Sequence, residues 1–412
     1  MTLINYYKQL IYLIPISLVI SNFATNLIFI LCSILFLIDT FRYKLFNYYK
    51  INFVYIFLTF FVLINISALL SQNILSFKYS IGFLRYGLLG ILIFYILDND
   101  KNFIKNFSYI LLATVIFIIA DAIIQKTFGK NIFSIRLQSY TTELEYVTGL
   151  FGEEKKLGSY LARIFPLIVI GGIIFLKKNN NELFFLPEIL LIIIGIIIIF
   201  TTERVALFIY LSIFLVILVK SKILFKNKIL WYLLTIVSFS TIFFLNPEIY
   251  LKYKSVIYQS GIVHPGFAEH DPTTVKGGYD TGQIYYFSKF YSDQIINSYN
   301  IFKENIFFGI GPKNYSNVLN NAWHPHNYYA QILSELGIFS FILFLFIFLF
   351  LFFKFIKIFF FKKLSSEAEE IKFIFITFFM VSLLPIPNGD FFNSWLCSIQ
   401  FLSLGFYLYY EK

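Results

Sequence analysis

The chain has 412 residues, of which 58% are hydrophobic and only 14% are charged, and its formal net charge is +10. Apolar runs of about 20 residues, the length that spans a hydrocarbon core, recur along the whole sequence. This composition excludes a soluble globular protein and predicts a polytopic protein of the lipid bilayer. Lipid cannot satisfy free backbone polar groups, and continuous apolar runs without period-two alternation favour helices over barrel strands. The predicted fold class is therefore all-α.

Twelve apolar segments are predicted to cross the membrane and to form a single membrane domain over residues 1–412. Their ranges are 9–21, 24–40, 52–70, 78–97, 103–124, 158–176, 186–201, 204–220, 228–246, 326–353, 370–387 and 392–410. Two polar loops interrupt this series. The first covers 125–157, and the larger one, at 247–325, lies between the ninth and tenth helices. The larger loop starts as irregular sequence rich in Gly, Pro and Asp and is predicted to become helical toward its end.

The basic residues predict the orientation of the chain. Lys and Arg gather in alternate short loops, which marks those loops as cytoplasmic. They include Arg42, Lys44, Lys50, Lys101, Lys105, Lys177, Lys178, Lys220, Lys222, Lys354 and Lys357. The two polar loops then lie outside, and both termini are cytoplasmic. Because this bias accounts for most of the positive charge, the predicted partner is the bilayer, and no nucleic acid is expected.

Two of the four histidines stand together in His324-Pro325-His326-Asn327, directly before an apolar helix. Imidazole takes up and releases a proton near neutral pH, so His324 and His326 are candidates for a general base at the outer face. The alternative is a helix cap, with Asn327 or His324 closing the first turn and Pro325 fixing the approach. A cap explains the proline and the asparagine, but it hardly explains two histidines.

No metal site is predicted. His264 and His270 lie near Glu269 and Asp271 in the large loop, but their spacing matches no known ligand pattern. The two cysteines, Cys32 and Cys397, fall inside predicted membrane helices, so neither a disulfide framework nor a thiolate metal site is expected.

An ionisable side chain at membrane depth is costly and therefore marks a candidate functional site. Arg204 stands at the outer end of the helix pair 186–201 and 204–220. Either it pairs with Glu203 or reaches to the interface, or its guanidinium binds an anion such as phosphate through two parallel hydrogen bonds. Arg85 and Arg163, inside the fourth and sixth predicted helices, are candidates of the same kind, and structural pairing is the favoured interpretation for both.

The block ENIFFGIGPKNYSNVLNNAWHPHNYYAQILSELGIFSFILF resembles the signature region of the O-antigen ligase and polymerase superfamily. In that region a Gly-x-Gly turn precedes a His-Asn pair and a helix carrying Glu-Leu-Gly. The matching residues are Gly309, Gly311, His326, Asn327, Glu335 and Gly337. Two further stretches, GLFGEEKKLGSYLARIFPL and FTTERVALFIY, resemble weaker motifs of the same superfamily.

The resemblance implies a multi-pass glycosyltransferase of the bacterial inner membrane, of the O-antigen ligase type. Such an enzyme moves a glycan from an undecaprenyl-diphosphate carrier to an acceptor hydroxyl, on the lipid A core or another glycan, at the periplasmic face and without a metal or other cofactor. His326 would deprotonate the acceptor, and Arg204 would neutralise the diphosphate. The residues expected to bind substrate are His324, Asn327, Arg136, Arg85, Lys289, Gly309 and Gly311.

Three points stay open. Either histidine could be the base, although His326 is favoured because it precedes the asparagine as in the family. Lys289 or Lys303 would have to replace an arginine that the family often carries before its Gly-x-Gly turn. A polymerase of the same superfamily shares the donor, the face and the motif. A flippase or transporter also fits twelve helices, but no repeat relates the two halves of the sequence.

Overall fold

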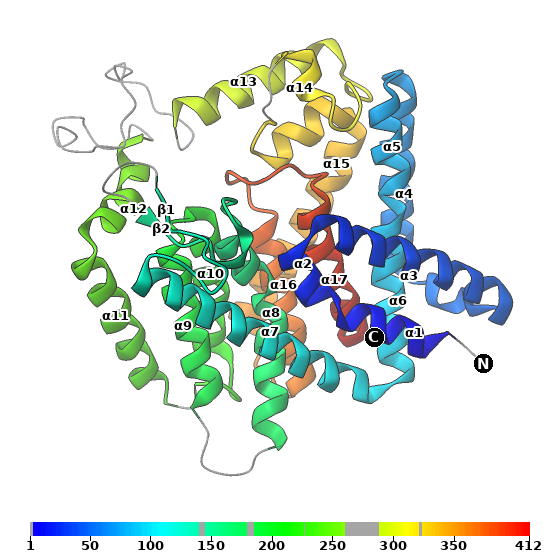
Figure 1. The fold of residues 1–412 in the computed structure, drawn as a ribbon. Coiled ribbons are helices and arrows are strands. Elements are labelled where there is room, and N and C mark those ends of the chain that lie inside the picture. The colour runs from blue at the N-terminus through cyan, green and yellow to red at the C-terminus, as the bar shows by residue number, and fades with distance from the viewer. Residues whose placement is uncertain (1–2, 140–144, 179–184, 226, 260–287, 321–323) are drawn as a thin grey trace. The chain divides into compact units, whose positions relative to one another are not determined.

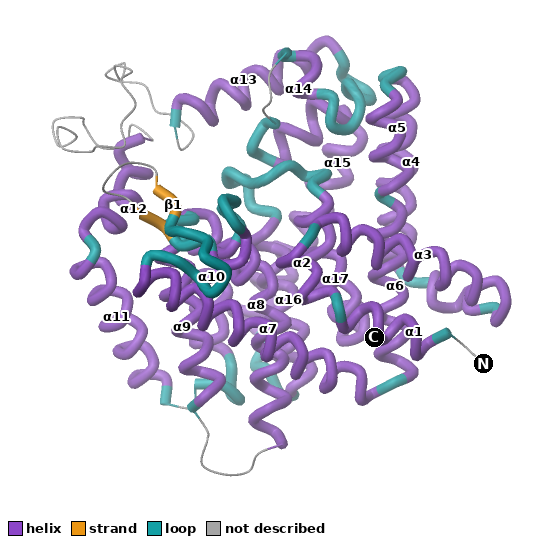
Figure 2. The backbone as a smooth tube through the Cα atoms, viewed as in Figure 1, coloured by secondary structure: helices purple, strands orange, loops and turns teal. Residues whose placement is uncertain are grey.

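The computed structural model describes residues 3–139, 145–178, 185–225, 227–259, 288–320 and 324–412. These residues are mostly helical, which confirms the all-α prediction (Figure 2). Strand structure within them is limited to β1 (Gln138–Ser139) and β2 (Glu145–Tyr146), which pair antiparallel with Gln138 opposite Tyr146.

In chain order the helices are α1 (Ile4–Tyr12), α2 (Ile14–Ile20), α3 (Asn22–Tyr43), α4 (Asn52–Leu70), α5 (Ile74–Gly82), α6 (Leu84–Asn99), α7 (Lys101–Phe128), α8 (Leu157–Lys178), α9 (Leu186–Phe200), α10 (Arg204–Lys220), α11 (Lys228–Leu245), α12 (Pro247–Gln259), α13 (Lys289–Glu304), α14 (Tyr315–Val318), α15 (Tyr328–Ile356), α16 (Glu367–Ser382) and α17 (Ser394–Glu411). Two 3₁₀ turns (Leu45–Tyr49 and Gly149–Phe151) and a π-helical turn (Lys357–Phe361) complete the regular structure of the described residues.

Seven helical segments among the described residues are long and apolar enough to cross a membrane, as expected of a multi-pass membrane protein. They are Asn22–Tyr43, Asn52–Leu70, Ile74–Asn99, Lys101–Phe128, Leu157–Ile174, Lys228–Leu245 and Tyr328–Phe361. Each of the twelve predicted ranges overlaps helix, but the agreement is not complete. The range 9–21 is divided between α1 and α2, where Pro15 lies in the first turn of the new helix, and 78–97 is divided between α5 and α6. The range 370–387 extends beyond the end of α16 at Ser382. The number of crossings therefore stays a prediction.

The described helices form two compact units. The first unit comprises Met1–Thr114, Pro166–Ile174 and Asn297–Lys412. Within it α6 packs along both α17 and α3, and α15 packs against α4 and α16 (Figure 1). A Cβ at Gly405 of α17 would lie 2.5 Å from the Cβ of Ile93 in α6, so a residue without a side chain lets these two helices approach closely.

The second unit comprises Val115–Phe165 and Phe175–Ile296. Within it α9, α10 and α11 pack together, and α12 folds back on α11. The described part of the loop after α7 is held by a buried glutamine on that helix. Gln125 Oε1 accepts the backbone N–H groups of Thr148 (3.0 Å) and Gly149 (2.7 Å), and its Nε2 donates to the Arg136 carbonyl (3.1 Å). This segment is thus an ordered part of the unit.

Candidate active site

The His-Pro-His-Asn segment lies at the N-terminal end of α15, in the first unit. The side-chain oxygen of Asn327 accepts the backbone N–H groups of Tyr329 at 2.9 Å and Ala330 at 3.1 Å, so this residue is the N-cap. His326, immediately before it, has a φ of 53°, in the left-handed region that non-glycine residues seldom adopt. The strained residue turns the chain sharply into the helix. The capping interpretation is therefore correct for Asn327 and leaves the histidines to be explained.

The two imidazoles lie against each other, with ring centroids 3.9 Å apart and planes tilted by 37°. The loop between α16 and α17 holds them, because the Asn388 N–H donates to the His326 carbonyl at 2.7 Å. Burial and, to a lesser extent, the nearby His324 lower the pKa of His326 to about 4, although a hydrogen bond with the Asn388 backbone opposes both effects. Burial likewise lowers the pKa of His324, against the opposing charge of Asp390. Both rings are therefore neutral at pH 7, the form in which imidazole can accept a proton.

Beneath the histidines lies a buried polar network that the sequence alone did not indicate. Gln331 Nε2 donates to Glu335 Oε2 at 3.0 Å and to Asp390 Oδ1 at 2.8 Å, and its Oε1 accepts the Phe391 N–H at 2.8 Å. Lys313 Nζ lies 3.1 Å from Asp390 Oδ2. Burial alone would lower the pKa of Lys313, but the charge and hydrogen bond of Asp390 outweigh it and raise that pKa. Lys313 therefore stays protonated and balances the half-buried carboxylate of Asp390.

The glycines of the signature block have a packing role in the structure. α15 is broken at Gly337, which has a φ of 75°. The segment before α14 fills the break with backbone hydrogen bonds. Ile310 N donates to the Ser334 carbonyl at 3.1 Å, Gly311 N donates to the Glu335 carbonyl at 2.9 Å, and Ile338 N donates to the Ile306 carbonyl at 2.9 Å.

These backbones meet too closely for side chains. A Cβ at Gly309 would lie 2.3 Å from the carbonyl carbon of Glu335, and a Cβ at Gly337 would lie 2.3 Å from the carbonyl oxygen of Phe307. The Gly-x-Gly turn and the Glu-Leu-Gly helix are thus two halves of one contact. Substrate binding by Gly309 and Gly311 stays a prediction, and close packing is the role that the structure describes for them.

Arg85 belongs to the same unit and lies in the first turn of α6. Its guanidinium donates to the Gly82 carbonyl at 2.8 Å, to the Asn26 amide oxygen at 3.1 Å and to the Tyr86 hydroxyl at 2.7 Å. It also lies 4.5 Å from the centre of the Tyr86 ring. These partners are neutral, so they hold the guanidinium in place without neutralising its positive charge.

Arg204 begins α10 in the second unit. Its guanidinium donates twice to the carbonyl of Lys252, at 3.1 Å from Nε and 2.7 Å from Nη2, and also to the hydroxyl of Ser255. Glu203, the expected partner, is engaged elsewhere. Its two oxygens accept the N–H groups of Gly158 at 2.7 Å and Ser159 at 2.9 Å, at the N-terminus of α8.

The other predicted cations are also in this second unit. Arg136 and Lys289 are exposed, the first in the loop after α7 and the second at the start of α13. Arg163 is buried within α8. Among the described residues no cluster of three or more His, Cys, Asp or Glu side chains is arranged to hold a metal ion, and His264 and His270 lie outside those residues.

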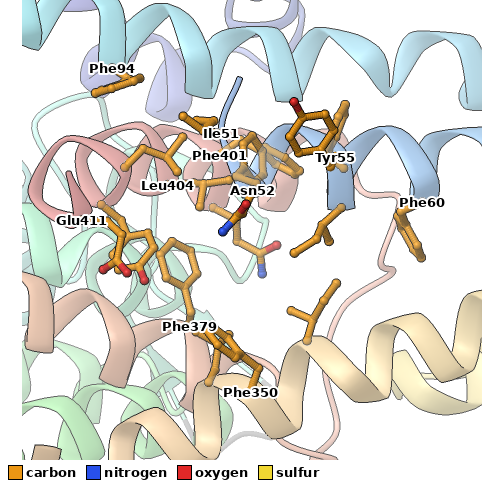
Figure 3. Close-up of a pocket in the computed structure, with 18 of the residues that line it drawn as sticks. Ile51, Asn52, Tyr55, Phe60, Phe94, Phe350, Phe379, Phe401, Leu404 and Glu411 are labelled. Carbon is orange, nitrogen blue, oxygen red and sulfur yellow. The ribbon is translucent and has the colours of Figure 1, made fainter. Parts of the chain in front are cut away.

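A large apolar cavity lies within the first unit, bordered by α4, α15 and α17 (Figure 3). Its volume is about 1160 Å³. Phe60 lies at one end in the close-up, while Phe94 and Glu411 lie at the other. Phe391, which follows Asp390 of the polar network, lines the cavity and packs against Phe60 at a ring distance of 5.9 Å. Phe391 therefore belongs both to the lining of the cavity and, through its backbone N–H, to the polar network.

These features describe a multi-pass membrane protein with neutral imidazoles at one end of a broken membrane helix. A family model described as "O-Antigen ligase" matches residues 189–345, which include Arg204, the histidine segment and the break in α15. The match confirms, over these residues, the resemblance noted in the sequence. No curated protein and no solved structure matches the chain.

The close backbone contact predicts that Gly309→Ala is much more damaging than an alanine at an open glycine. Gly152 is the matched control, because its φ of 68° is nearly that of Gly309 (64°) but nothing lies within 4 Å of an added Cβ. We expect Gly152→Ala to cost about 1–3 kcal/mol from backbone strain alone, because its φ of 68° is combined with a ψ of −126°. Gly309→Ala should lower the melting temperature in detergent considerably further, or prevent recovery of folded protein. Equal melting curves for the two variants would contradict the packing role.

Proposed function

We propose that the protein is a glycosyltransferase of the O-antigen ligase type, acting at the periplasmic face of the bacterial inner membrane. Its donor is a glycan on undecaprenyl diphosphate, and its acceptor is a hydroxyl group of the lipid A core. The observation that carries this proposal is the pair of neutral, half-buried imidazoles at the start of α15, within the segment that matches the family.

In this mechanism His326 takes the proton of the acceptor hydroxyl as its oxygen attacks the anomeric carbon of the donor sugar. The new glycosidic C–O bond forms, and the bond between the anomeric carbon and the diphosphate oxygen breaks. Undecaprenyl diphosphate leaves with the bonding electrons, and Arg204 neutralises the charge that develops on it. No electron carrier and no nucleotide is needed to balance this step.

A base with a pKa of about 4 is weak, and the physical cause of that value also indicates how it is corrected. Burial disfavours the imidazolium, and a diphosphate brought close to the ring favours it through its negative charge. Donor binding therefore raises the pKa of His326 toward neutrality when a base is needed. Two rings 3.9 Å apart cannot both be protonated cheaply, so one proton is held at a time.

The cavity of the first unit supports a lipid-linked donor. Its lining is mainly aromatic and aliphatic, from helices that include two of the apolar spans, α4 and α15. One of its lining residues, Phe391, also donates its backbone N–H to Gln331 of the polar network. We propose that the isoprenoid chain of the donor occupies this cavity, with the diphosphate beyond the end that Phe60 and Phe391 line, next to the polar network.

Replacing His326 with Ala in cells is expected to abolish surface glycan, because removing a general base typically costs about 10²- to 10⁴-fold in rate. His324→Ala is the matched control and should retain more activity, since His326 precedes the cap residue as in the family. Arg204→Ala should also fail, with all variants inserted at wild-type level. The measurement is analysis of lipopolysaccharide from a deletion strain carrying each variant.

The glycan that accumulates in those strains distinguishes the candidate functions. Long glycan that stays on its carrier, with no glycan attached to the core, identifies a ligase. A single repeat unit attached to the core identifies a polymerase instead. Normal lipopolysaccharide in the His326→Ala strain would contradict both assignments.

Narrowing the cavity should weaken use of the lipid-linked donor. Ile347 lines the cavity, whereas Ile342, on the same helix, is 57% exposed and does not line it. We expect Ile347→Trp to raise the KM for the undecaprenyl-linked donor several-fold and Ile342→Trp to leave it near the wild-type value. Transfer rates with purified protein in nanodiscs measure both. Identical KM values for the two variants would contradict the placement of the isoprenoid chain in this cavity.

A further inference from the structure

Lys313, between the Gly-x-Gly turn and α14, is a cation to which the sequence motifs assign no role. Its Nζ lies 3.1 Å from Asp390 Oδ2 and 4.4 Å from the centre of the Tyr79 ring. Among the described residues these are the contacts of its ammonium, which carries three N–H donors. The side chain is 25% exposed, so the remaining donors are accessible to a ligand.

The backbone holds Lys313 in a conformation that suits glycine better than lysine. Its φ is 59°, in the left-handed region that residues with a side chain seldom adopt. The residues before it are fixed on two sides. Gly311 N donates to the Glu335 carbonyl at 2.9 Å, at the break in α15. The Ser76 hydroxyl donates to the Pro312 carbonyl at 2.8 Å. A strained residue that its surroundings hold in place is a candidate functional residue.

The partner of Lys313 belongs to the loop that also holds the histidine segment. Asp390 stands two residues after Asn388, whose N–H donates to the His326 carbonyl at 2.7 Å. Two residues of extended chain span at most about 7 Å. Burial lowers the pKa of His324, the charge of Asp390 raises it, and the charge of Lys313 lowers it. The ammonium and the imidazoles therefore belong to one site.

The same loop connects Lys313 with the cavity, because Phe391, next to Asp390, lines it. An isoprenoid chain in the cavity would bring its diphosphate past Phe391 to the pair of Asp390 and Lys313. We propose that Lys313 donates a charge-assisted hydrogen bond to the diphosphate of the lipid carrier, in the unit that also contains His326. This inference rests on the proposed function and adds to it a residue that recognises the charged group of the donor.

Asp390 has two opposite effects on this binding. Its carboxylate keeps the ammonium in place while no donor is bound, but it also competes with the diphosphate and repels it. Its two oxygens have separate partners. Oδ1 accepts the N–H groups of Gln331 and Phe392, both at 2.8 Å, and Oδ2 faces Lys313. Asparagine at this position keeps an oxygen for the first two bonds and removes the competing charge, so it should strengthen diphosphate binding.

The test measures binding of undecaprenyl diphosphate and of undecaprenol to the purified full-length protein in a maltoside detergent, which contains no phosphate. Lys313→Met should weaken binding of the diphosphate about tenfold or more, as expected for a lost charge-assisted hydrogen bond, and leave binding of undecaprenol unchanged. Asp390→Asn should bind the diphosphate more tightly than the wild type. The matched control is Lys78→Met, next to Tyr79 on α5, and it should bind both ligands like the wild type.

The outcomes separate this inference from the proposed function. Lys313→Met that binds undecaprenyl diphosphate like the wild type would overturn the role of Lys313 and leave the proposed function standing. Equal losses of affinity for both ligands in Lys313→Met and Asp390→Asn would also overturn it, because the ion pair would then only maintain the fold. A wild type that binds the diphosphate no better than undecaprenol would overturn both the inference and the proposed function.

Two further results keep the inference testable if Lys313→Met does not fold. Tighter binding of the diphosphate by Asp390→Asn supports competition for the ammonium, and weaker binding contradicts it. Phosphatidylglycerol that displaces undecaprenyl diphosphate at equal concentration would contradict a site for the diphosphate.

Discussion

The break in α15 at Gly337 is the constraint on which the candidate site depends. A helix interrupted within an apolar layer leaves backbone carbonyl and amide groups without partners, and lipid supplies none. In this protein Ile310 and Gly311 donate to the carbonyls of Ser334 and Glu335. The Ser67 hydroxyl also donates to the Glu335 carbonyl, at 2.8 Å. Because these bonds require near-contact of two backbones, they require glycine on both sides.

The same backbone contact also helps to position the residues of the candidate active site. It fixes the segment that leads to Lys313, whose ammonium balances Asp390. Asp390 and Gln331 tie the loop between α16 and α17 to the N-terminal half of α15. The same loop binds the backbone of His326 through Asn388. The imidazoles are therefore held by a chain of hydrogen bonds that begins at the helix break, which is how a strained residue at position 326 can be maintained.

The sequence predicted the parts of the fold that depend on apolar runs and left out those that depend on distant contacts. Helices such as α4 and α11 were predicted to within a residue or so, because a continuous apolar run in lipid satisfies its own backbone groups as a helix. Asn327 was correctly identified as a possible cap. The network of Gln331, Lys313 and Asp390 was missed, because Asp390 lies about 60 residues from Gln331 in a short loop, and an isolated Asp carries no spacing signal. The family motif pointed to the glycines but not to the reason for them, which is visible only where two backbones meet.

The proposed function depends on a neutral His326, which takes the acceptor proton during transfer of a glycan from a diphosphate carrier. The most direct test is a reconstituted reaction that contains purified protein, undecaprenyl-diphosphate-linked glycan and lipid A core, in which both the glycosylated core and free undecaprenyl diphosphate are quantified. We expect the wild type to form the two products in equal amounts and His326→Ala, correctly folded and still binding the donor, to form neither at a detectable rate. Transfer by His326→Ala at the wild-type rate would contradict this expectation.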